Sequence, residues 1–111
     1  MPSVKIEEIA PEAQFKVNSV PASTATVSSV PSSASSVTLL PNTPTRSFFT
    51  IFNDSTASLF VKFGTGAATN DFTVKLLAGG YFESTIPAYT GIISGIWDSE
   101  DGSAYTTELS E

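Results

Sequence analysis

One short segment near the C-terminus gathers side chains suited to metal binding or acid–base chemistry. Asp98, Glu100 and Asp101 lie within four residues of one another and precede Gly102. Carboxylates around a glycine can ligate calcium, but this spacing differs from the twelve-residue EF-hand loop, which ends in a glutamate. We therefore predict that residues 98–102 form an exposed acidic hairpin turn and hold no metal ion.

Paired carboxylates are also the catalytic groups of glycosidases, in which one acts as acid and the other as base or nucleophile. Glu83, Asp98 and Glu108 are the candidates for such a pair. Nothing in their spacing brings them together, and a chain of 111 residues rarely builds a deep cleft. A glycosidase is accordingly the third-ranked hypothesis.

Two reactive residue types are missing, because the chain contains no His and no Cys. Their absence excludes Ser-His-Asp and Cys-His nucleophilic centres, ordinary zinc sites and disulfides. We expect a protein that is not an enzyme and that uses no metal and no cofactor.

The charge balance is acidic, with eleven Asp and Glu against five Lys and Arg and a net charge of −6. A phosphate-backbone binder needs a basic face, so we expect no direct contact with nucleic acid. No run approaches the roughly 20 apolar residues of a membrane helix. The acids Glu7, Glu8 and Glu12 argue against a secretory signal at the N-terminus.

Four large aromatic side chains have a polar handle and could stack on a sugar or another protein: Tyr81, Tyr89, Trp97 and Tyr105. In a small β domain the same side chains ordinarily pack in the core. Both interpretations stay open from the sequence alone.

Turn signals recur about every 8–12 residues, and no segment has the periodicity of an amphipathic helix, which is typical of an all-β sandwich or barrel. The expected strands are 24–30, 36–40, 47–52, 57–63, 71–76, 80–84, 91–97 and 103–109. We predict an all-β fold, a single β-sandwich of jelly-roll or immunoglobulin-like topology.

Two hairpins are predicted from short connections between these strands. Segments 24–30 and 36–40 flank the turn residues 31–34, and this pairing is preferred to a disordered Ser/Thr/Pro linker. Segments 47–52 and 57–63 flank a connection of four residues, 53–56.

The sides of each expected strand on which its apolar residues lie predict which side chains are buried. Phe49 and Ile51 on one face and Phe48 and Phe52 on the other predict that segment 47–52 is buried on both sides. In segment 71–76, Phe72, Val74 and Leu76 are expected to point inward.

The first 22 residues follow neither a helical nor a strand period and contain prolines at positions 2, 11 and 21. We predict that residues 1–22 are an extended arm and that residues 23–111 are the sandwich domain. The apolar side chains expected to anchor this arm to a partner are Ile6, Ile9, Phe15, Val17 and Val20.

The order and spacing of several short motifs over residues 24–110 resemble a small β domain that recurs among tailed-bacteriophage virion proteins. The motifs are residues 36–40, Arg46, and residues 49–55, 59–64, 72–75, 79–83, 89–91, 95–97 and 107–109. The resemblance implies a structural role in the virion and provides no catalytic residues.

The resemblance and the composition together predict a capsid decoration (cement) protein that binds the outside of the phage head after assembly in the host cytoplasm. Its expected partners are the major capsid protein and other copies of itself, as a dimer or trimer. The alternative is a tail or fibre module that binds host-surface glycan through Trp97, Tyr81 and Tyr89, which requires an exposed Trp97.

Overall fold

The computed structural model describes residues 21–111, and nearly all of the proposed arm, with its five anchoring residues, lies outside them. All eight expected strands are confirmed, and the described residues contain no helix. The strands are β1 (Thr24–Pro31), β2 (Val37–Leu40), β3 (Arg46–Asp54), β4 (Leu59–Phe63), β5 (Val74–Leu76), β6 (Tyr81–Glu83), β7 (Ile93–Trp97) and β8 (Ser103–Ser110).

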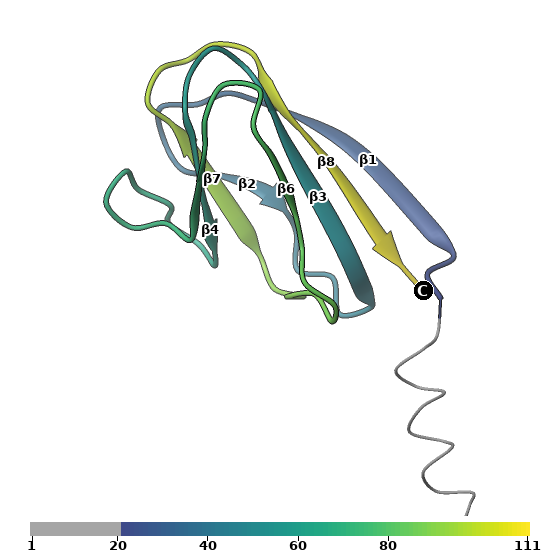
Figure 1. Cartoon of the computed structure of the whole chain (residues 1–111). Helices are drawn as coiled ribbons and strands as arrows, with labels where there is room; N and C mark the ends of the chain where they lie inside the picture. The colour runs from purple at the N-terminus through teal and green to yellow at the C-terminus, as the bar shows by residue number, and fades with distance from the viewer. Residues whose placement is uncertain (1–20) are drawn as a thin grey trace, which may run out of the picture.

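The strands form two antiparallel four-stranded sheets that pack as a β-sandwich, with orders β1-β8-β3-β6 and β2-β7-β4-β5 (Figure 1). Four antiparallel pairs are nested in the sequence, namely β1 with β8, β2 with β7, β3 with β6 and β4 with β5. Such nesting arises when one long hairpin is rolled into two layers, and it defines the jelly-roll topology. The immunoglobulin-like alternative is thereby excluded.

Both predicted hairpins are wrong, because each short connection passes from one sheet to the other. β1 pairs with β8 and β2 with β7, while β3 and β4 also belong to different sheets. The rows Phe49/Ile51 of β3 and Leu59/Val61 of β4 all belong to the buried core. The two rows therefore reach the core from opposite layers of the sandwich and not from one hairpin.

The core lies between the sheets, and β3 contributes to it only from its inward side. Phe49 and Ile51 are fully buried, whereas Phe48 is half-buried and Phe52 is 38% exposed. The prediction that this strand is buried on both faces is wrong, since the second sheet covers only the inward face of β3. Phe72 is also 41% exposed rather than inward, because β5 begins only at Val74.

A buried amide links the end of β3 to β7 and to the segment after β5. The Asn53 side chain is fully buried, and its Nδ2 donates to the carbonyls of Ala57 (2.8 Å), Leu76 (3.0 Å) and Leu77 (3.0 Å). Its Oδ1 accepts from Trp97 Nε1 at 3.2 Å. One side chain therefore satisfies polar groups that the sandwich would otherwise bury without partners.

Replacing Asn53 with Ala should lower the free energy of unfolding by about 3 kcal/mol, because several buried carbonyls and the Trp97 indole lose their partner. Urea titration followed by Trp97 fluorescence measures this loss. The matched control is Asn42→Ala at an exposed position, which should change stability by less than about 0.5 kcal/mol. Equal stability of the two variants would contradict the stabilising role of the buried Asn53 side chain.

Candidate interaction surface

Three aromatic side chains form a row across the outer face of the sheet β1-β8-β3-β6. Tyr105 of β8 lies opposite Phe52 of β3, and Phe52 lies opposite Tyr81 of β6. They are 44%, 38% and 55% exposed, respectively. Directly opposed residues on adjacent strands project from the same face of a sheet, so the three rings line one exposed surface. We call them the aromatic row.

The next row on this face contains no aromatic residue and a single charged one. Val27, Thr107, Thr50 and Glu83 follow one another across the four strands. The Tyr81 hydroxyl donates to Glu83 Oε2 at 3.0 Å. Loss of solvent around the phenol and, secondly, this hydrogen bond raise the pKa of Tyr81 above its usual value, so the hydroxyl remains a neutral donor.

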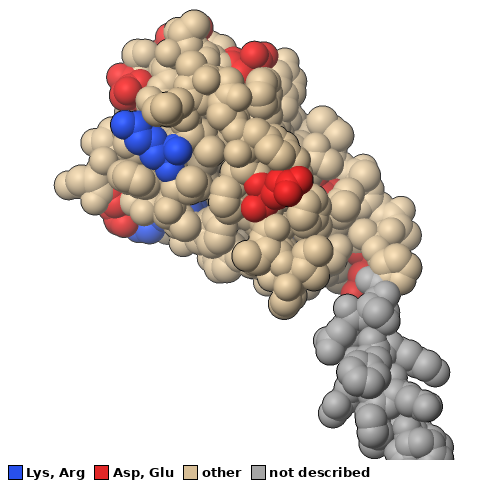
Figure 2. Space-filling model, viewed as in Figure 1, with Lys and Arg blue, Asp and Glu red and all other residues tan. Residues whose placement is uncertain are grey.

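The outer face of the other sheet is partly covered by the loop between β4 and β5. Ala67 of that loop is buried, and its N–H donates to Ser94 Oγ of β7 at 3.1 Å. Phe72 packs edge-on against Phe60 of β4, with ring centroids 5.0 Å apart. The larger uncovered surface therefore belongs to β1-β8-β3-β6. In Figure 2, Lys and Arg are visible only on the left of the molecule, away from β1.

The edge strand β1 adds a second exposed feature beside the aromatic row. Its residues from Thr24 to Ser29 are all exposed, and Val27 is 68% exposed. Among residues 21–111, β8 is the only strand that pairs with β1, so no described strand occupies its other edge, which we call the open edge of β1 (Figure 1). The candidate interaction surface thus consists of the aromatic row, Val27 and the edge of β1.

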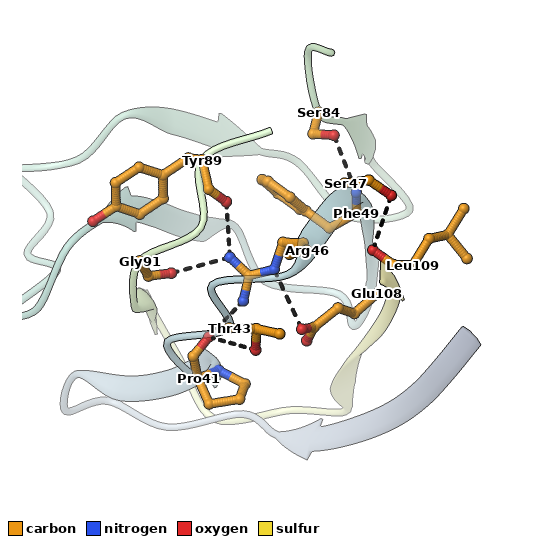
Figure 3. A network of polar contacts seen from close by, with 10 residues as sticks. All are labelled: Pro41, Thr43, Arg46, Ser47, Phe49, Ser84, Tyr89, Gly91, Glu108 and Leu109. Carbon is orange, nitrogen blue, oxygen red and sulfur yellow. Dashed lines mark hydrogen bonds and ion pairs between the residues drawn. The ribbon is translucent and has the colours of Figure 1, made fainter. Parts of the chain in front are cut away.

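A buried arginine holds the end of the sandwich at which β3 begins (Figure 3). The Arg46 guanidinium donates to the carbonyls of Tyr89 (2.8 Å), Gly91 (3.0 Å) and Pro41. Its Nε also lies 3.5 Å from Glu108 Oε2, in a buried ion pair. Arg46 therefore ties β3 to β8 and to the connections that precede β3 and β7, which fixes the sheet that carries the aromatic row.

The predicted acidic turn follows β7, but it leads into the other sheet and is therefore not a hairpin turn. Its carboxylates accept hydrogen bonds from neighbouring loops: Asp98 from the Ser58 N–H (3.1 Å), Glu100 from the Ala34 N–H (3.3 Å) and Asp101 from the Thr56 N–H (3.2 Å). Among residues 21–111, no group of three or more acids is placed to hold a metal ion. The turn is therefore hydrogen-bonded to two other connections at this end of the sandwich, β1–β2 and β3–β4.

The three carboxylates considered for glycoside hydrolysis do not meet. Glu83 is exposed on the outer face, whereas Glu108 is buried on the inner face of the same sheet. Asp98 follows β7 and lies beside Ser58, near the opposite end of β8 from Glu108. No pair of these acids can flank one glycosidic bond.

The aromatic residues considered for glycan binding separate in the structure. Trp97 is only 1% exposed and packs in the core, so the exposed indole that the glycan alternative requires is absent, and this alternative loses its main contact. Tyr89 is 39% exposed and stacks on Phe63 at 5.1 Å, away from the aromatic row. Only Tyr81 lies in the row, together with Tyr105. Phe52 was missed because its strand was expected to be buried on both faces.

Comparison with protein-family models, with curated proteins and with solved structures gives no match to this chain. The part of the chain that the structure describes contains no helix long and apolar enough to span a membrane.

Arg46→Met should lower the free energy of unfolding by about 3 kcal/mol or more, because it removes three donated hydrogen bonds and leaves Glu108 buried without its cation. Adding Glu108→Gln should recover part of this loss. Lys75→Met, an exposed control in which the cation lies over Phe60, should cost less than about 1 kcal/mol. Urea denaturation measures all three, and a near-neutral Arg46→Met would refute the bracing role.

Proposed function

We propose that the protein is a virion structural protein of a tailed bacteriophage that decorates the capsid and reinforces it from outside. The observation that carries the proposal is the open, nearly uncharged outer face of β1-β8-β3-β6, with Tyr105, Phe52 and Tyr81 side by side. Aromatic side chains are enriched, and charged ones depleted, at the centre of protein interfaces.

The distribution of charge supports a protein partner on this face. The chain has a net charge of −6, so an acidic surface would repel a partner of like charge. Glu83 is the only charged residue in the two rows described above. Contact through the aromatic row therefore buries apolar area with little electrostatic cost.

The topology and the sequence support the same role. Jelly rolls occur in viral capsid domains, although also in lectins and cupins, so the fold alone does not assign a function. The motifs over residues 24–110 add the resemblance to phage virion proteins. Residues 1–22 immediately precede β1, the edge strand of this sheet, in the sequence.

A glycan-binding module of a tail or fibre is the second candidate, and one observation favours it. Tyr81 combines an exposed ring with a hydroxyl and with the Glu83 carboxylate, which together provide stacking and polar contacts for a sugar. Trp97 and Tyr89 do not contribute to this patch. The capsid role uses the whole aromatic row and is therefore preferred.

Removal of two exposed rings tests the proposal by co-sedimentation with genome-free capsids of the parent phage. Tyr81→Ala combined with Tyr105→Ala should weaken saturable binding about tenfold or more. Each aromatic anchor at an interface centre contributes roughly 1 kcal/mol or more to binding. The matched control is Leu77→Ala with Ile86→Ala, which removes two side chains that are 63% and 80% exposed elsewhere. This control should bind like the wild type.

Two further arms separate the alternatives. Deletion of residues 1–22 should abolish capsid binding while Trp97 fluorescence shows a folded sandwich, as expected for an anchoring arm. Tail preparations and a glycan array serve as competing targets. Binding to tails or glycan with none to capsids would overturn the decoration role and favour the second candidate.

A further inference from the structure

We propose that two copies of this chain associate edge to edge through β1, antiparallel, with a twofold axis passing between Val27 and its counterpart. The two sheets β1-β8-β3-β6 would then join into one continuous sheet. This inference does not depend on the capsid role, because it concerns the purified chain alone.

Within the described part of the chain, the open edge of β1 lacks the features that usually prevent edge pairing. Natural edge strands are short, charged, bulged or covered. β1 spans eight residues, pairs with β8 in unbroken register and carries no charged side chain. Pro31 is its only residue without an N–H and stands at its very end.

β1 is also poorly buried within its own chain. Thr26 and Ser28 lie on the inward side of the sheet, as their partners Glu108 and Thr106 do, yet both remain exposed. Val27 on the outward side is 68% exposed. A strand exposed on both faces gains most of its stability from one neighbour, and a second neighbour would double its backbone pairing.

The hydrogen-bond pattern identifies the groups that face the open edge. The Ser32 N–H donates to the Gly102 carbonyl at 3.0 Å and continues the β1·β8 register. Antiparallel pairs alternate between bonded and non-bonded, so every second residue of β1 directs its N–H and C=O away from β8. These residues are Ala25, Val27 and Ser29.

Twofold symmetry then selects the register. Residues whose N–H and C=O point to the open edge must pair with residues of the same kind in the second copy. The twofold axis therefore passes between a residue and its own copy. An axis at Val27 pairs Ala25 with Ser29 and Thr26 with Ser28. Every backbone N–H of β1 that points to the open edge then has a partner. An axis one residue later would place Pro31, which has no N–H, opposite Ala25.

A second copy fits this edge better than an unrelated strand. Residues 17–45 carry no charge, so the self-paired strands bring no like charges together although each chain carries −6. The isologous arrangement closes after two copies and leaves no further open β1 edge. It also buries Val27 against Val27 and places the two aromatic rows on one side of the joined sheet.

Sedimentation equilibrium of the full chain tests the proposal, because dimers have twice the monomer mass of 11.6 kDa. Wild type should be dimeric at submillimolar concentration and dissociate on dilution. Val27→Lys and Val27→Glu should each raise the dissociation constant about tenfold or more, since identical charges then lie directly opposite each other. An equimolar mixture of the two should form heterodimers.

Leu77→Lys adds the same charge at a 63% exposed position outside β1 and should dimerise like the wild type. Circular dichroism and Trp97 emission confirm that each variant is folded. A monomeric wild type, a Val27→Lys variant as dimeric as Leu77→Lys, or a Lys/Glu mixture without heterodimers would each overturn the proposal. Because no capsid is present, these outcomes are independent of the capsid-binding result.

Discussion

The register of β3 against β8 is the constraint on which both the core and the outer face depend. It places Phe52 opposite Tyr105 and Phe49 opposite Glu108, so alternate residues of both strands enter the core or form the surface together. A slip of one residue would put Phe49 on the same face as Tyr105, so either Phe49 would leave the core or Tyr105 would enter it. The same pairing that makes the core therefore makes the aromatic row.

Two buried polar side chains fix this register from opposite ends of β3. Arg46 at its start bonds carbonyls before β3 and β7 and pairs with Glu108 of β8. Asn53 near its end donates to carbonyls of two connections, at Ala57 and Leu77, and accepts from Trp97. Both have partners that a slipped strand would leave unsatisfied in the core, and unpaired buried polar groups are costly.

The sequence was sufficient to predict all eight strands, because alternation and turn residues are local signals. Strand pairing was not predictable, since a four-residue connection such as 53–56 can close a hairpin or cross between layers. The same ambiguity made the exposed aromatic row unpredictable from the sequence. Phe52 and Phe48 resemble core residues by type, and Trp97 resembles a binding residue, until the topology shows which side of each strand is covered.

Under the proposed function, partner contacts lie on β1-β8-β3-β6, and the aromatic residues outside this sheet stay uncovered. Hydroxyl-radical footprinting of the free protein and of assembled particles compares the reactivity of the two sets of aromatic side chains directly. Tyr81, Phe52 and Tyr105 should lose reactivity on assembly, whereas Phe72 and Tyr89, which are similarly exposed in the free chain, should keep it. Protection of Phe72 and Tyr89 with no change at the aromatic row would contradict the account.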